Sequence, residues 1–259
     1  MSLEEEVKNL SPRELKEIAD LPRSPKQFTA EPIEPIFAGE TAVLIATGPS
    51  ITDEQLAFVK QHHDAQNCRV FTINNAYQKV PWTDVHLSCN GNWWQMYYPR
   101  SETLRNIPCH KYTWYPELAE KFNIKYIGAI EKTGLSTDPR IIHINHGSGP
   151  MCINLALHYG IKRLLLIGHD MKYAPDYNPK NCESGSTPRH FFSEYPEPLQ
   201  HWPSVKVGLS KPGVLDGLIE VYDKMVPQLK TLEMEIINCT PDSALTSFPM
   251  STLEKELNK

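Results

Sequence analysis

The residues best placed to do chemistry begin with a Gly-Pro-Ser turn behind a short apolar segment. The turn consists of Thr47, Gly48, Pro49 and Ser50. A glycine opens φ values closed to other residues and lets backbone N–H groups approach a ligand, and the serine adds a hydroxyl. The turn therefore predicts an anion site. It matches neither a Walker A loop nor the three-glycine dinucleotide fingerprint, and an ordinary strand-to-helix connection capped by Ser50 or Thr52 is an equal alternative.

Further polar residues follow other predicted strands. They are Asn74, Asn75, Asn90, Asn92, Ser148, Gly149, Gly168, His169 and Asp170. Asparagine amides both donate and accept hydrogen bonds, which suits ribose or sugar hydroxyls and the edge of a base. Simple turn chemistry is the alternative for each one. Their recurrence at one predicted sheet edge favours a ligand site, and Asp170 is expected to bind a ribose diol unless it caps a helix or pairs with Arg163 or Lys172.

Histidines and tyrosines supply candidates for acid–base work. His146 and His169 lie beside the predicted site, and His190 and His201 lie in a long polar segment after Asp170. Any of them could act as a general base, because imidazole titrates near neutrality. Tyr173 and Tyr177 could bind a leaving phosphate. The aromatic residues Trp93, Trp94, Tyr97 and Tyr98 are interpreted as core packing.

Alternating strands and helices must position these residues. Strands are predicted at 42–46, 69–73, 85–89, 111–114, 125–129, 141–144, 163–167 and 235–238, and helices at 53–63, 116–122, 149–159, 214–229 and 251–257. Short apolar strands separated by helices predict an α/β, Rossmann-like, doubly wound and mostly parallel sheet with helices on both faces. In such sheets ligands bind at the carboxyl ends of the strands.

The domain prediction is an N-terminal Pro-rich arm at 1–36, with a short helix around 12–19, and one α/β domain at 37–259. The arm is expected to wrap the core or a neighbouring subunit, so a homo-oligomer is one expectation. Residues 171–210 have no sustained periodicity, and a loop of that length next to a site predicts a lid.

Composition limits the classes of molecule that the protein is expected to bind. The formal net charge is −5, which argues against bulk nucleic-acid binding, and no run of apolar residues is long enough to span a bilayer. The six cysteines lack Cys-x-x-Cys spacing, so no zinc site is expected. We expect a cytoplasmic protein that binds small molecules.

These motifs resemble the bacterial lipooligosaccharide sialyltransferases, the related flagellar motility accessory factors, and the archaeal hydroxymethylpterin pyrophosphokinases. The resemblance rests on islands between residues 41 and 250: the Gly-Pro-Ser turn, residues 71–77, residues 148–170 from the Ser-Gly helix to the Gly-x-Asp strand end, and residues 239–245. Two positions depart from the family pattern. Thr47 replaces an asparagine, and Leu209 stands where the family has a lid histidine.

The resemblance implies a pocket for a cytidine monophosphate (CMP) sugar, lined by Ser50, Asn74, Asn90, Ser148, Gly168 and Asp170, with lid tyrosines on the phosphate and a histidine as base. The leading hypothesis is a metal-independent glycosyltransferase that moves a sugar from a nucleotide donor to a hydroxyl acceptor. One alternative is a pyrophosphokinase-like enzyme, in which ATP and Mg²⁺ would need Asp170, Asp176 and Asp84. Another is a non-catalytic nucleotide-binding protein.

Overall fold

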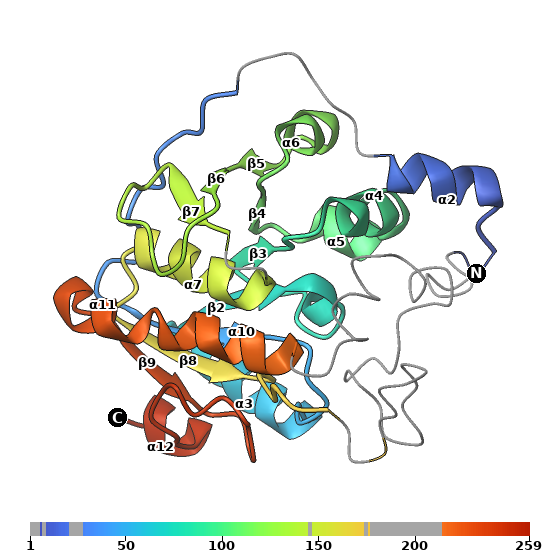
Figure 1. Cartoon of the computed structure of the whole chain (residues 1–259). Helices are drawn as coiled ribbons and strands as arrows, with labels where there is room; N and C mark the ends of the chain where they lie inside the picture. The colour runs from blue at the N-terminus through green and yellow to red at the C-terminus, as the bar shows by residue number, and fades with distance from the viewer. Residues whose placement is uncertain (1–5, 7–8, 21–27, 145–146, 174–175, 177–213) are drawn as a thin grey trace.

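The fold is centred on one parallel sheet, as a computed structural model of the chain shows (Figure 1). The structure describes residues 6, 9–20, 28–144, 147–173, 176 and 214–259. The order of the seven strands is β5 (Lys125–Tyr126), β4 (His110–Thr113), β3 (Val85–Leu87), β2 (Arg69–Ile73), β1 (Thr41–Ile45), β8 (Arg163–Ile167) and β9 (Glu235–Asn238). All neighbouring pairs are parallel.

Helices cover both faces of this sheet (Figure 1). One face packs against α3 (Asp53–Asp64) and α12 (Leu253–Leu257), and the other against α7 (Ser148–His158), α10 (Val214–Asp223) and α11 (Val226–Leu232). The central strands β1 and β8 are apolar after their first residue because each is buried on both sides. The predicted α/β, Rossmann-like class is confirmed.

A third apolar cluster lies beside the β3 and β4 end of the sheet. It joins α2 (Pro12–Ala19), η1 (Asn74–Gln78), α4 (Gly91–Arg100), α5 (Glu102–Asn106) and α6 (Pro116–Phe122). Trp93, Trp94 and Tyr97 are buried in it and Tyr98 packs against it, which confirms that these rings are core.

The described part of the N-terminal arm lies against the domain. The Gln95 side chain donates to the Ile18 carbonyl at 2.9 Å, and further along the arm the Ile33 N–H donates to the Pro139 carbonyl at 3.0 Å. Ile33 and Phe37 are buried in the main core. The segment after α2 therefore adds apolar area to the sheet domain.

Two predicted elements are divided in the structure. The strand expected at 125–129 ends at Tyr126, and the chain then leaves the large sheet to form β6 (Gly128–Ile130), which pairs with β7 (Ile141–His143). The helix expected at 214–229 is broken between α10 and α11, since Pro227 lacks the N–H that a continuous helix needs at that point.

Other boundaries differ from the prediction by one or two residues, and β3 ends at Leu87 rather than at 89. Helices α4 and α5 were not predicted. No helix in the described part of the chain is long and apolar enough to cross a membrane.

Candidate functional site

A cavity of about 280 Å³ lies where the strand order reverses. From β1 the chain proceeds through β2 to β5 on one side, while β8 and β9 lie on the other, so β1 and β8 border the switch point. The cavity opens at the carboxyl ends of these two strands. It is lined by ten predicted site residues, namely Thr47, Gly48, Pro49, Asn74, Ser148, Gly149, Gly168, His169, Asp170 and Tyr173.

The floor of the cavity is formed by the turns after β1 and β8, which touch. The Gly48 N–H donates to the Gly168 carbonyl at 2.9 Å. A Cβ on Gly48 would lie 1.7 Å from Asp170 Oδ2 and 2.4 Å from the Gly168 oxygen. Gly48 has no positive φ, so the prediction that it supplies an unusual backbone conformation is wrong: glycine is needed here for close approach. The positive φ, +69°, belongs to Gly168.

Asp170 is the carboxylate of the cavity. It is 8% exposed, and the Ser50 hydroxyl donates to its Oδ2 at 2.9 Å. Burial raises the pKa of this carboxyl, and the Ser50 hydrogen bond opposes that rise only in part. Lys172 donates instead to the Asp242 carbonyl and Arg163 pairs with Glu235 and Glu256, so the alternative of a structural salt bridge is wrong.

The opposite wall is the amino end of α7, held to the ends of β2 and β3. Ser148 Oγ donates to Asn74 Oδ1 at 3.0 Å and accepts from the Cys89 N–H at 3.0 Å. The Ser88 hydroxyl donates to the same Asn74 oxygen at 2.9 Å. These bonds fix the Asn74 side chain and leave its amide nitrogen without a hydrogen bond among the described residues.

Helix α7 has no side-chain cap, and Pro150 in its first turn has no N–H. The N–H groups of Ser148 and Gly149 make no hydrogen bond within the described part of the chain. A helix amino end with free N–H groups and a positive dipole binds anions.

His169 forms the back wall and is held on three sides. Its N–H donates to Thr240 Oγ1 at 3.0 Å, its carbonyl accepts from the Ser243 hydroxyl at 2.5 Å, and its Nδ1 lies 3.2 Å from the Ile167 carbonyl. The last contact assigns the proton to Nδ1 and leaves Nε2 as a buried acceptor without a partner. Burial lowers the pKa of the imidazole to about 4, so at neutral pH this ring accepts hydrogen bonds and is a poor general base.

Helix α10 closes the cavity with a face that sequence reasoning missed. Leu215, Leu218 and Tyr222 line it at helical spacing. A Cβ on Gly149 would lie 2.4 Å from the Tyr222 hydroxyl, which places this ring against the start of α7. An i, i+3, i+7 pattern was visible in the sequence but indicates only a buried helix face, because it does not reveal what the helix packs against.

The remaining predicted site residues lie elsewhere. Ser50 does not line the cavity but donates a hydrogen bond to Asp170, which does. Asn75 is buried and accepts from the Trp93 indole at 2.6 Å. Asn90 caps α4 by accepting from the Asn92 N–H at 3.0 Å. None of the three asparagines Asn75, Asn90 and Asn92 lines this cavity, and their assignment to ligand binding stays a prediction. Most of the lid predicted at 171–210, with Tyr177, His190 and His201, lies outside the described residues, as does His146.

The cavity thus combines a polar end with an apolar wall. Free N–H groups and the Asn74 amide can hold an anion, Asp170 can accept from hydroxyls, and the two leucines of α10 can cover an apolar ring. Across the described ranges no group of three or more His, Cys, Asp or Glu residues could hold a metal ion.

Comparisons with known proteins extend this description. No protein-family model matches the chain, and a search of curated proteins finds no match in sequence. The fold is similar to the solved structure of a MAf glycosyltransferase from Magnetospirillum magneticum AMB-1, with a TM-score of 0.55 and 12% sequence identity. The similarity covers 97% of this chain and 38% of that one, so the chain spans little more than a third of that protein. At this identity the likeness establishes the shared fold.

Proposed function

We propose that the chain is a glycosyltransferase-like enzyme that binds a nucleotide sugar at the switch point and transfers the sugar to a hydroxyl acceptor. The observation that carries the proposal is the convergence of Gly48, Asn74, Ser148 and Asp170 on one cavity beside the free amino end of α7. The glycosyltransferase named in the structural comparison has the same fold, which supports the reaction class.

The donor we propose is a CMP-sugar, as the sequence motifs imply. The Ser148 and Gly149 N–H groups would bind its phosphate, because the helix dipole adds to their hydrogen bonds. Asp170 would accept from ribose hydroxyls and the Asn74 amide would donate to the nucleoside. The cytosine ring would pack against Leu215 and Leu218, since contact with a flat ring removes this apolar wall from water.

Catalysis would then rest on positioning and on stabilising the charge that develops on the departing phosphate. Helix N–H groups and Tyr173, which lines the cavity, are the groups for that task. The scheme needs no metal ion. His190 and His201 remain our candidates for the base that deprotonates the acceptor, with Tyr177 as a second phosphate ligand.

The pyrophosphokinase-like alternative finds less support in the geometry. Of its three acidic residues only Asp170 lines the cavity. Asp84 lies at the amino end of β3, where its carboxylate accepts from the Val70 N–H at 2.7 Å. A nucleotide-binding protein without turnover would share the cavity and differ only in rate.

Calorimetric titration with CMP, UMP and AMP tests the proposal directly. We expect CMP to bind, and binding to weaken about tenfold in Ser148→Ala, which frees Asn74. No heat at millimolar CMP would refute the nucleotide site, and magnesium-dependent binding of ATP alone would favour the kinase alternative. Hydrolysis of a CMP-sugar, measured with His190→Ala and His201→Ala, separates an enzyme from a binding protein: a true base should cost about 10²–10⁴ in rate.

A further inference from the structure

A second cavity, of about 380 Å³, lies at the amino ends of β4 and β5, whereas the switch-point cavity lies at the carboxyl ends of β1 and β8. Its ionisable lining comprises Tyr98, Arg105, Cys109, His110, Lys111 and Lys125, and we call it the basic cavity. No carboxylate is among its described lining residues. Burial raises the pKa of the Cys109 thiol to about 11, so this residue adds no negative charge at neutral pH.

None of the three cations is neutralised by a carboxylate among the described residues, and two of them are held in place by backbone carbonyls. Lys111 is 8% exposed and its ammonium donates to the Ile107 carbonyl at 2.5 Å, while Arg105 donates through Nη1 to the carbonyls of Tyr98 and Pro99. Lys125 is exposed and makes no hydrogen bond or ion pair with another described residue. Two ammonium protons of Lys111 and most guanidinium protons of Arg105 remain available.

His110 adds a neutral donor. Its Nδ1 lies 2.5 Å from the Tyr159 hydroxyl, which lies 2.9 Å from the Tyr112 hydroxyl. Burial, and next the charge of Lys125, lower the pKa of His110, so the ring is neutral at neutral pH. Both tyrosine hydroxyls can be satisfied if Tyr112 donates to Tyr159 and Tyr159 donates to Nδ1. The proton of the imidazole is then on Nε2, where it can donate.

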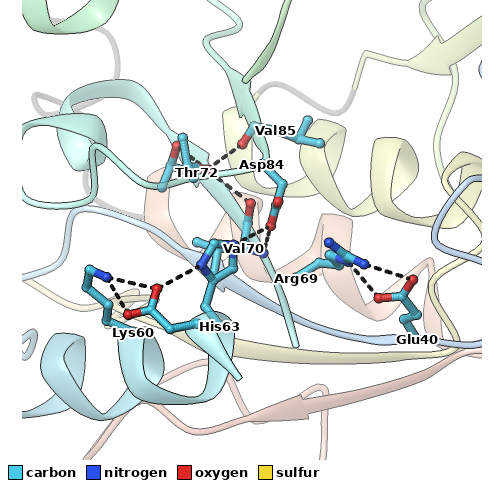
Figure 2. A network of polar contacts seen from close by, with 10 residues as sticks. Glu40, Lys60, His63, Arg69, Val70, Thr72, Asp84 and Val85 are labelled. Carbon is cyan, nitrogen blue, oxygen red and sulfur yellow. Dashed lines mark hydrogen bonds and ion pairs between the residues drawn. The ribbon is translucent and has the colours of Figure 1, made fainter. Parts of the chain in front are cut away.

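Two nearby cations, Arg69 at the start of β2 and Lys60 in α3, are paired, as Figure 2 shows. Arg69 contacts Glu40 at 2.6 Å and Lys60 contacts Asp64 at 2.6 Å. The Asp84 carboxylate is occupied by the Val70 N–H and by His63 at 3.1 Å. In a chain of net charge −5, three unpaired cations around one cavity are therefore a local exception.

We propose that the basic cavity binds a phosphate group, held by Arg105, Lys111 and Lys125 with a hydrogen bond from His110. Side chains that only donate suit an anion, and guanidinium and ammonium groups form short, charge-assisted bonds to phosphate. The group could belong to a free phosphate compound or to a lipid headgroup, because both present the same oxygens. This site is separate from the switch-point cavity and does not depend on the proposed transferase activity.

The test compares the full chain with Lys125→Glu and with a matched control, Lys224→Glu. Lys224 is also exposed, makes no ion pair with a described residue and lies outside both cavities. Inorganic phosphate is titrated at constant ionic strength, set with sodium chloride, while the histidine ring resonances are followed by NMR; His110→Gln assigns the His110 signal. A parallel arm measures sedimentation with vesicles containing phosphatidic acid.

We expect a saturable shift of the His110 signal that Lys125→Glu weakens by about tenfold or more and Lys224→Glu leaves unchanged. Vesicle binding that Lys125→Glu alone abolishes would equally support the site and identify a lipid source. Absence of both effects in the wild-type chain would overturn the proposal. It would also be overturned if both lysine variants weakened binding equally, because only general electrostatics would then be at work.

Discussion

The substitution Gly48→Ala tests the construction of the site most sharply. The added methyl would have to occupy a point 1.7 Å from Asp170 Oδ2 and 2.4 Å from the Gly168 carbonyl oxygen. Neither atom is the end of a long flexible side chain, since one is backbone and the other belongs to a short carboxylate bonded to Ser50. The turns after β1 and β8 must therefore separate to clear the Gly168 carbonyl, and the carboxylate must rotate away.

The expected cost follows from these two responses. Overpacking of a filled site costs about 1–3 kcal/mol. Loss of the Ser50 to Asp170 hydrogen bond adds about 1 kcal/mol. We therefore expect Gly48→Ala to lower the free energy of unfolding by about 2–4 kcal/mol, and to weaken CMP binding because Asp170 is displaced.

Urea unfolding measures the stability, and calorimetry measures the binding. The control is Gly217→Ala in α10, where a Cβ meets nothing within 4 Å. A glycine inside a helix destabilises it relative to alanine, so the control should gain up to about 1 kcal/mol.

Repeating the substitution in an Asp170→Ala variant tests the contact with Asp170 specifically. In Asp170→Ala the carboxylate oxygen is absent, so part of the cost of Gly48→Ala should disappear, while the clash with the Gly168 carbonyl remains. An equal cost in both backgrounds would show that Gly48 and Asp170 are not coupled. That result would refute the close contact on which our account of the floor rests.

Three other substitutions, one of them with a matched control, have distinct expected outcomes. Asp170→Asn should raise the unfolding temperature at neutral pH. Burial raises the pKa of this carboxyl, so its ionised form, which prevails once the pH exceeds that pKa, destabilises the folded state. CMP binding should fall about tenfold in the same variant. Ser148→Ala should cost about 1–3 kcal/mol in urea unfolding because the Cys89 N–H loses its partner, whereas Ser247→Ala should cost little, since the Ser247 hydroxyl is buried without one. Burial lowers the pKa of His86 to about 3, so between about pH 6.5 and that value the unfolded chain binds a proton that the folded chain does not, and stability falls as pH falls. His86→Gln should reduce the slope of stability against pH in this window by about 1.4 kcal/mol per pH unit, and an unchanged slope would contradict this.

Much of the core of the fold could be predicted from local pattern. Strands β1, β2, β8 and β9 were expected within a residue of their ends, because each is a short, mostly buried segment rich in β-branched and other apolar residues. Helix α4 was missed because Pro99 lies inside it, and a proline argues against a helix in the sequence. The order of the strands could not be read from the chain.

The site was predicted in part for the same reason. Residues directly after β1 and β8 line the cavity because parallel strands place their carboxyl ends together. Asn90 and Asn92 failed this rule, since Asn90 caps α4 and Asn92 lies inside it. Tyr222 is far from every motif in the sequence and joins the site only through the packing of α10 on α7.

The close contact between the turns after β1 and β8, at Gly48 and Gly168, also limits how this cavity could change. Two backbones that leave no room for a methyl group cannot be reshaped by exchanging one side chain, so the floor would tolerate almost no variation. On the far side, Leu215 and Leu218 are ordinary side chains of a helix, and they can be enlarged, trimmed or made polar without disturbing the sheet. A library aimed at a new ligand for this cavity should therefore randomise α10 and leave both strand turns untouched.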